Sequence, residues 1–321
     1  MEVNNQSSKN YQSYETIKEI YEKIFEKSNT SIIVTKLSGG MKNAVYLIED
    51  NGDKIVLKIG PQNEDVMISV DKDIMWWEAR MLEFFESIDV PTPKLLHFDS
   101  NNELCQSSCI FMSYISGNNF LKEKENLSEE EISNIEYQLG VFSSRICSIK
   151  SKEFFLPSQP NNKFSNNYDF TTKIFKLLLN DAKNNDVDLG QEGYKKILRI
   201  LEANRNSINN IRNLCLCHTD MWDGNVLIEN GEVVGLIDLA DLYFCDELMT
   251  FYFHTIDGKT SESFLNGFNI KELNRDEKIR IEIYRMYVIL KMIVDCKIKK
   301  YGKFDWMYDN LDSRVRALQK K

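Results

Sequence analysis

The chain has 321 residues, of which 42% are hydrophobic and 28% are charged, and its formal net charge is -9 at pH 7. This length exceeds the usual size of a single domain, so two lobes or domains are expected. The acidic balance argues against a nucleic-acid partner, because a phosphate backbone requires surplus lysine and arginine on the binding face. It is compatible with a cationic small-molecule partner.

The sequence shows no signal for export or membrane insertion. Its first residues, MEVNNQSSKN, have neither the basic nor the apolar region of a signal peptide. The most apolar late stretch, MYVILKMIVDC, is interrupted by Lys291 and Asp295. The seven cysteines follow no framework spacing, which indicates reduced thiols. We therefore expect a cytoplasmic monomer without a membrane partner.

The first part of the chain is predicted to be a small, mostly antiparallel sheet carrying one main helix. A helix over 14–28 precedes three strand patterns, SIIVTKL, NAVYLIED and DKIVLKIG. The last two are joined by Asn51-Gly52, a strong hairpin signal. The stretch DKDIMWWEARMLEFFESI then predicts an amphipathic helix ended by VPTP, and KLLHF and CIFMSYI predict two more strands.

After Gly117 the pattern becomes helical. Ser128 and Glu131 form a capping-box pattern that opens a helix through about Ile149, and helices follow over 168–184 and 191–212. A second hairpin, NVLIENGEVVGLID, turns at Asn230-Gly231, and residues from 246 onward are helical in pattern. The prediction is an α+β protein with an N-terminal lobe (1–112), a hinge (113–118) and a mainly helical C-terminal lobe (119–321).

The stretch CHTDMWDGNVLI carries the strongest chemical signal. His218, Asp220 and Asn225 match the catalytic-loop pattern H-x-D-x-x-x-x-N, and Asp238 follows at the end of the second hairpin. Asp220 is predicted to accept the proton of a substrate hydroxyl, and the oxygens of Asn225 and Asp238 to bind magnesium. His218 is predicted to be structural. The alternative is that these residues are ordinary turn and cap residues, but their combined spacing favours a site.

Zinc is a second possibility at the same place. Cys215, Cys217 and His218 lie close together, and alternation along a strand places both thiols on one face. Structural zinc requires four ligands, usually from C-x-x-C pairs, and no second pair follows. The two cysteines are better explained as small buried strand residues.

The N-terminal part offers matching phosphate-binding groups. Lys58 lies in the strand KIVLKIG, and Glu78 in the following helix is the candidate carboxylate partner. Gly39 and Gly40, in LSGGMKN between two strands, would let backbone amides approach phosphates. The alternatives are an ordinary hairpin turn for the glycines and an exposed helix position for Glu78.

With these residues the chain resembles the aminoglycoside phosphotransferase and choline kinase-like family, small-molecule kinases with a bilobal protein-kinase-like fold. The matching stretches are LSGGMKNAVYLI, KIVLKIG, WEARMLEFFESIDVPTPKLL, IFMSYISG, CHTDMWDGNVLI and VVGLIDLADLYFCDEL. The resemblance implies that Lys58 contacts the α- and β-phosphates and pairs with Glu78. It also implies that Asp220 is the catalytic base and that Asn225 and Asp238 bind Mg²⁺.

The resemblance further implies a hinge at MSYI, where backbone groups of Ser113 and Ile115 meet the purine edge and Met112 lies at the back of the pocket. The chain departs from the family pattern at two positions of the catalytic loop. Thr219 stands where glycine is common, and Asp223 stands where relatives often have proline. These departures concern the packing of the loop more than the chemistry.

The acceptor is the least determined feature. Asp241, Asp246, Glu247 and Asp257 follow the metal-binding aspartate and could face a polyamine-like acceptor, or could form a solvated acidic edge. Trp222 could stack on a ring or cation of the acceptor, or pack internally.

The predicted function is magnesium-dependent transfer of phosphate from ATP or GTP to an aminoglycoside or a related hydroxylated amine, with antibiotic resistance as a possible role. A metabolic kinase for choline, homoserine or a methylthioribose-like sugar is the alternative within the family. A catalytically silent nucleotide-binding regulator is the alternative from another class.

Overall fold

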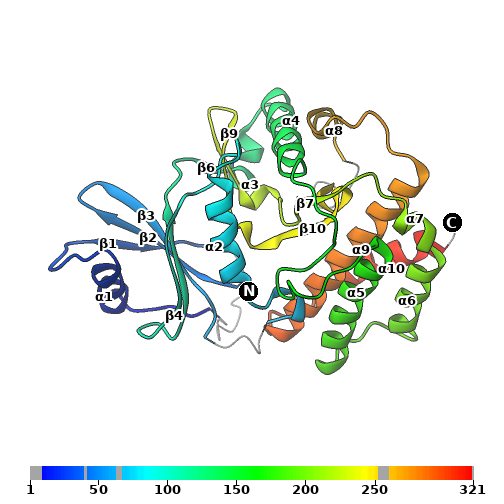
Figure 1. The fold of residues 1–321 in the computed structure, drawn as a ribbon, viewed down its shortest axis with the longest axis horizontal. Helices are drawn as coiled ribbons and strands as arrows, with labels where there is room; N and C mark the ends of the chain where they lie inside the picture. The colour runs from blue at the N-terminus through cyan, green and yellow to red at the C-terminus, as the bar shows by residue number, and fades with distance from the viewer. Residues whose placement is uncertain (1–8, 40–41, 63–66, 252–259, 320–321) are drawn as a thin grey trace.

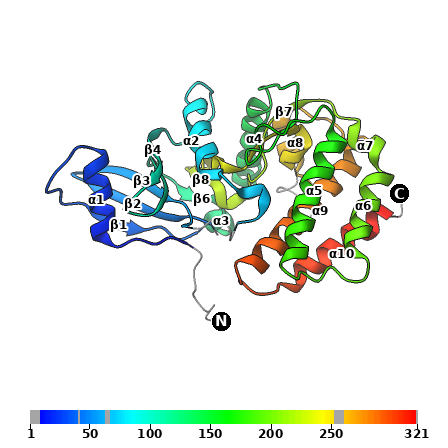
Figure 2. The ribbon, with the colours of Figure 1, turned by 60° about the horizontal axis from the view of Figure 1, so that its bottom comes forward.

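The computed structural model describes residues 9–39, 42–62, 67–251 and 260–319. The antiparallel sheet with helix α1 lies at one end of the molecule, and helices α5, α6, α9 and α10 lie at the other end (Figures 1 and 2). This arrangement confirms the predicted α+β class, with a sheet-rich first part and a helical second part. Within the described ranges, no helix is long and apolar enough to cross a bilayer.

The N-terminal sheet is antiparallel throughout. Its strands follow the order β1 (Ile33–Lys36), β2 (Ala44–Asp50), β3 (Asp53–Ile59), β5 (Ser107–Ser113) and β4 (Leu95–Asn102). The predicted hairpin turn is present: Asn51 and Gly52 both have positive φ, at 52° and 95°, as a type I′ turn requires. Helix α1 (Tyr14–Ile24) packs on the sheet and forms a small separate core with it.

Helix α2 (Ile74–Phe85) connects the sheet to the rest of the molecule (Figure 1). The indole nitrogen of Trp77 donates a hydrogen bond of 2.8 Å to the carbonyl of Leu242 in the second part of the chain. The short helix η2 (Ser69–Asp71) precedes α2, and Ser69 donates through its backbone and its hydroxyl to the carboxylate of Asp181, at 2.7 and 2.6 Å. These contacts hold the N-terminal part against the helical part.

The second part of the chain combines helices with two small sheets. The α-helices are α3 (Phe120–Glu123), α4 (Glu129–Ile146), α5 (Asn167–Asn184), α6 (Gly193–Ala203), α7 (Arg205–Asn209), α8 (Glu262–Phe268), α9 (Arg275–Ile298) and α10 (Asp305–Gln319). One sheet pairs β7 (Leu214–His218) with β10 (Leu242–Asp246), and the other has the order β6 (Asn118–Asn119), β8 (Val226–Glu229), β9 (Glu232–Leu236). The remaining short helices are η3 (Lys124–Asn126), η4 (Asp223–Asn225), η5 (Leu239–Asp241) and η6 (Glu247–Phe251).

The local predictions for this part are confirmed in most respects. The Ser128–Glu131 capping box is present at the start of α4. The single helix expected over 191–212 is instead two helices, because the chain leaves the helical conformation at Asn204. The strands β6 and β10 were not expected, and β10 forms because it pairs with β7 in antiparallel register.

Two glycines allow α8 to lie directly against α4. A Cβ atom at Gly140 of α4 would stand 2.2 Å from the carbonyl oxygen of Phe264. A Cβ atom at Gly267 of α8 would stand 2.0 Å from the carbonyl oxygen of Tyr137. Both partners are backbone atoms and cannot move aside, so any larger residue would force the helices apart.

Candidate active site

The predicted catalytic loop leaves β7 at His218 and ends in η4. The backbone N–H of Asp220 donates to His218 Nδ1 at 3.1 Å. The amide nitrogen of Asn225 donates to both the carbonyl and the carboxylate of Asp220, at 2.8 and 3.0 Å. The amide oxygen of Asn225 is therefore the atom that could bind a cation, while the amide nitrogen orients Asp220.

Burial determines the protonation of this loop. Burial raises the pKa of Asp220 well above its usual range, and the carboxylates of Asp241 and Asp238 raise it further. A carboxylate with a raised pKa is a better proton acceptor near neutral pH. Burial lowers the pKa of His218 to about 4, so its ring is neutral at pH 7 and can accept the Asp220 N–H. This contact agrees with the structural role predicted for His218.

The rest of the loop is tied to the segment before α4. Lys124 forms an ion pair of 2.7 Å with Asp223, and the Asn119 amide donates to the carbonyl of Gly224 at 2.7 Å. The ring of Trp222 lies over Gly224, where a Cβ atom would come within 2.4 Å of the indole. Trp222 remains 39% exposed at the side of the loop. Asp223 is thus held to the segment before α4 by an ion pair.

Lys58 joins the N-terminal sheet to the metal-ligand candidate Asp238. Its Nζ lies 2.6 Å from Glu78 Oε2 and 2.8 Å from Asp238 Oδ1. Burial alone would lower the pKa of Lys58, but the carboxylates of Asp238 and Glu78 raise it, so the amine stays charged. The pair with Glu78 implied by the resemblance is therefore present.

The two candidate metal ligands are held next to each other by the backbone. The N–H of Ile237 donates to the carbonyl of Asn225 at 3.0 Å, which places Asp238 beside the loop. Asp238 adopts a left-handed conformation with φ 63°, which is costly for a residue other than glycine and common at functional sites. A carboxylate and an amide oxygen are donors that Mg²⁺ prefers. The residues present fit this ion.

A buried group of four charges adjoins these residues, and no sequence pattern predicted it as a group. Lys42, Asp71, Asp241 and Lys291 make up this four-charge cluster. Lys42 lies 2.6 Å from Asp71 and 3.5 Å from Asp241, and Lys291 lies 2.9 Å from Asp71 and 2.8 Å from Asp241. The available signal was Lys291 itself, a charge within an apolar helical stretch.

The four-charge cluster reaches the catalytic loop through the backbone of η5. The carbonyl of Asp241 accepts hydrogen bonds from the backbone N–H and the hydroxyl of Thr219, at 2.8 and 2.9 Å. Thr219 immediately precedes Asp220, so the position of Asp241 affects that of the catalytic carboxylate. A glycine at this position could not make the hydroxyl contact.

The glycine segment is described only in part. Gly39 has φ 120°, a conformation that favours glycine, and no atom lies within 4 Å of where its Cβ would be. Its carbonyl accepts a bond of 2.8 Å from Lys9. Gly40 lies outside the described residues. The open surroundings of Gly39 are compatible with the predicted approach to phosphates.

The predicted hinge follows the end of β5. The backbone N–H of Ser113 donates to the carbonyl of Lys94 at 2.9 Å, and the Lys94 N–H donates to the Ser113 hydroxyl at 2.9 Å, so the Ser113 N–H already has a partner. Met112 is buried beneath this strand end. The side chain of Ile115 packs on Gly235, where a Cβ atom would be 3.0 Å from Ile115 Cδ1.

One predicted acceptor residue must be corrected. Asp246 is fully buried and accepts bonds from Arg280 Nε at 2.7 Å and from the Tyr284 hydroxyl at 2.8 Å. A carboxylate with no solvent exposure and two side-chain partners cannot meet an acceptor. Asp246 is a core ion-pair residue, and the sequence did not reveal this because its partners lie in α9.

The other acidic residues predicted to contact the acceptor are buried and already paired with other side chains, where the structure describes them. Glu247 is 5% exposed and accepts from the Asn213 amide at 2.6 Å. Asp241 belongs to the four-charge cluster. Asp257 lies outside the described residues. Of the predicted acceptor residues that the structure describes, Trp222 has the most exposed side chain.

The chain was compared with known protein families, curated sequences and solved structures. Residues 33–265 match the model of the phosphotransferase enzyme family. No curated protein sequence matches the chain. Similar solved structures include a protein assigned as fructosamine-3-kinase from Haemophilus somnus 129PT, with 16% identity over 95% of this chain and 97% of that chain and a TM-score of 0.67.

Two aminoglycoside phosphotransferases are also similar in structure. A thermostable mutant of APH(4)-Ia in ternary complex with AMP-PNP and hygromycin B has 16% identity, covers 92% of this chain and 98% of that chain, and has a TM-score of 0.66. The streptomycin–ATP complex of APH(2'')-IIa has 22% identity, covers 94% and 96%, and has a TM-score of 0.60. At these identities the similarity establishes the shared fold.

Proposed function

Because the chain belongs to the phosphotransferase enzyme family, as its sequence resemblance predicted, we propose that it transfers the γ-phosphate of ATP or GTP to a hydroxyl group of a small molecule. The observation that carries this proposal is the convergence of one set of groups. Lys58 contacts Glu78 and Asp238, and Asn225, held beside Asp238, orients Asp220. Phosphoryl transfer needs these charges in one place and little other chemistry.

Each group has a role in the proposed reaction. The Lys58 amine binds phosphate oxygens of the nucleotide, and Glu78 keeps it in place. Asp220 accepts the proton of the acceptor hydroxyl as that oxygen attacks phosphorus, and Asn225 holds the carboxylate in position. Mg²⁺, which Asn225 and Asp238 would hold, neutralises phosphate charge when it is bound.

We propose an aminoglycoside or a related hydroxylated amine as the acceptor. Structures of the same fold are complexes with hygromycin B and streptomycin, and another is assigned as a fructosamine-3-kinase. Exposed Trp222 beside Asp220 is suited to stacking on a sugar ring or a cation. Antibiotic resistance would follow from an aminoglycoside acceptor.

One observation favours a second candidate, a metabolic kinase for choline, homoserine or a methylthioribose-like sugar. Asp241 is already paired with Lys42 and Lys291, and Asp246 is paired with Arg280. A polycationic acceptor would need uncommitted carboxylates, whereas a neutral or singly charged acceptor would not. The proposal also includes a cytoplasmic location and a monomeric state.

The proposal is tested by measuring nucleotide consumption with ATP and with GTP against a panel of aminoglycosides, choline, homoserine and methylthioribose. We expect one acceptor class to stimulate turnover, and magnesium removal to abolish it. Nucleotide binding without stimulation by any acceptor would favour the silent regulator instead.

The role of Asp220 has its own test. Asp220→Asn should reduce turnover by roughly 10²–10⁴-fold while nucleotide still binds. Asp223→Asn in the same loop is the matched control, because Asp223 pairs with Lys124 and has no role in the proposed chemistry. Turnover of Asp220→Asn close to that of the control would rule out the assignment.

A further inference from the structure

Three buried thiols form a compact group beneath the catalytic loop. Cys147 caps the C-terminus of α4, and Cys215 and Cys217 lie on one face of β7. Their sulfur atoms all lie within 4.8 Å of one another. The Cys215–Cys217 distance is 3.7 Å, and the Cys147–Cys217 distance is 3.9 Å. The sequence suggested only the pair on β7, and folding adds the third sulfur.

Two of the three sulfur–sulfur distances match those between thiolate ligands around one metal ion, and the third, between Cys147 and Cys215, is at most 4.8 Å. A metal–sulfur bond of about 2.3 Å places neighbouring sulfurs roughly 3.8 Å apart in a tetrahedron and roughly 4.0 Å apart in a trigonal plane. The two sulfur–sulfur distances involving Cys217 are 3.7 and 3.9 Å. An ion could therefore be bound with little movement of the backbone.

We propose that Cys147, Cys215 and Cys217 bind a single thiophilic d¹⁰ cation, Zn²⁺ or Cu⁺. Soft thiolate ligands select these ions over hard cations such as magnesium. Three sulfurs complete a trigonal Cu⁺ site, whereas Zn²⁺ in structural sites takes a fourth ligand. The hydroxyl oxygen of Thr250 lies 3.9 Å from Cys147 Sγ, and in the Zn²⁺ arm a neutral oxygen donor would have to fill the fourth position.

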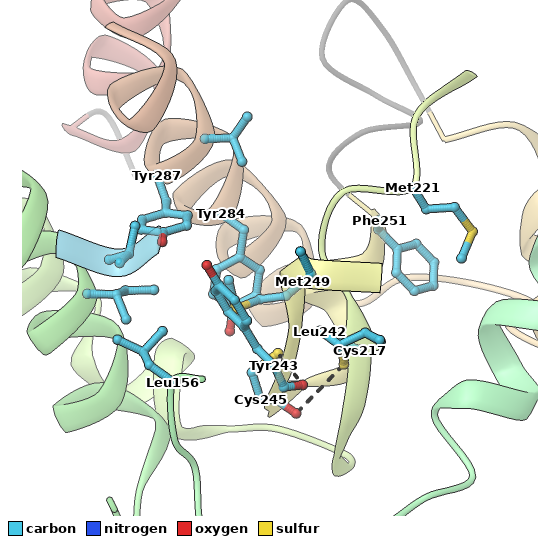
Figure 3. Packing of buried hydrophobic residues seen from close by; sticks show 14 of the residues in the cluster. Leu156, Cys217, Met221, Leu242, Tyr243, Cys245, Met249, Phe251, Tyr284 and Tyr287 are labelled. Atoms are coloured by element: carbon cyan, nitrogen blue, oxygen red, sulfur yellow. Dashed lines mark hydrogen bonds between the residues drawn. The ribbon is translucent and has the colours of Figure 1, made fainter. Parts of the chain in front are cut away.

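Binding exchanges protons for metal bonds. Burial raises the pKa of Cys217, and the pKa values of Cys215 and Cys147 are also raised, that of Cys215 chiefly by its hydrogen bond with Cys147, so the three groups are neutral thiols without an ion. In that state Cys217 donates weakly to carbonyl oxygens, including that of Cys245 at 3.9 Å (Figure 3). When the ion enters, up to three S–H protons pass to solvent and three metal–sulfur bonds form, so affinity rises with pH.

The site would brace the strand that carries the catalytic loop. Cys217 immediately precedes His218, whose ring holds the backbone of Asp220. Cys147 belongs to α4, so an ion would cross-link α4 to β7. A ligand that binds the folded chain alone raises its unfolding temperature.

The test uses the full-length chain, stripped with a chelator under reducing, anaerobic conditions and then titrated separately with Zn²⁺ and with Cu⁺. We expect one equivalent of at least one ion to bind and to raise the unfolding temperature. Cys147→Ser and Cys217→Ser should each weaken binding by at least about 100-fold. Cys296→Ser is the matched control, since its thiol lines a separate cavity between α5, α9 and α10, and it should bind as the wild type does.

X-ray absorption of the loaded wild-type chain gives a readout that needs no variant. We expect about three sulfur neighbours near 2.3 Å, joined by an oxygen neighbour in the Zn²⁺ arm. The proposal is overturned if neither ion binds in one equivalent, if Cys217→Ser binds like the control, or if the loaded ion has no sulfur neighbours. The thiols are then packing residues of the core.

Discussion

Replacing Asp246 by asparagine distinguishes a structural role from an acceptor-binding role. Asp246 and Arg280 are both fully buried and lie 2.7 Å apart, and the Tyr284 hydroxyl is the second side-chain partner of the carboxylate. Asparagine has almost the same shape, so Asp246→Asn removes the charge without opening a cavity. We expect the folded state to lose stability while the catalytic site is unchanged.

The expected magnitude follows from leaving Arg280 without its counter-charge. Breaking a buried ion pair by removing one partner costs roughly 3–5 kcal/mol. The lower end applies, because Arg280 Nη1 keeps a bond of 3.0 Å to the Ser207 carbonyl and asparagine can still accept from Nε. About 3 kcal/mol corresponds to a fall in unfolding temperature of roughly 4–5 °C for a chain of this size.

Two measurements check this prediction. Thermal and urea unfolding of the wild type and Asp246→Asn give the loss of stability, and steady-state kinetics give the KM for nucleotide and acceptor. The double variant Asp246→Leu, Arg280→Met should recover most of the loss, because an apolar pair leaves no buried charge. Wild-type stability of Asp246→Asn together with a raised acceptor KM would refute the core ion pair and restore Asp246 to the acceptor site.

Three further predictions follow from the buried groups. Because the pKa of His218 is about 4 when folded and about 6.5 when unfolded, the unfolded state binds more protons between these values. Stability should therefore fall as pH drops from 6.5 to 4, by about 3 kcal/mol in total. Urea unfolding measured across this pH range should show a smaller loss of stability in His218→Gln than in the wild type. An equal loss in both proteins would contradict the assignment to His218. Gly140→Ala should lower the stability of the folded state by about 1–3 kcal/mol or more, because the added Cβ would lie 2.2 Å from the Phe264 carbonyl oxygen. Helix propensity alone predicts the opposite, a gain in stability, so the sign of the change in unfolding temperature decides between the two. Lys291→Met should cost roughly 2–4 kcal/mol and lower kcat, since it removes the nearer of the two lysines paired with Asp241 and leaves only Lys42, at 3.5 Å. Lys291→Arg should retain most of the stability and of kcat. Wild-type urea unfolding and kcat in Lys291→Met would contradict the role of the four-charge cluster.

Local patterns were sufficient for most of the elements and for the spacing of the catalytic loop. The capping box of Ser128 and Glu131 and the hairpin at Asn51-Gly52 depend on residues at most three apart, and both are present as predicted. The spacing of Asp220 and Asn225 likewise lies within one loop, and the two side chains are hydrogen bonded. Short-range geometry restricts these features whatever the rest of the chain does.

Contacts between distant segments were decided by the tertiary structure. Asp246 meets Arg280 34 positions later, and Cys147 meets Cys217 70 positions later. No local pattern shows whether Asp246 faces an acceptor or is buried against α9, because the neighbouring sequence is the same in both cases. Burial of a charge or a thiol becomes favourable or costly only through its partners, and packing of the whole chain determines which partners are present.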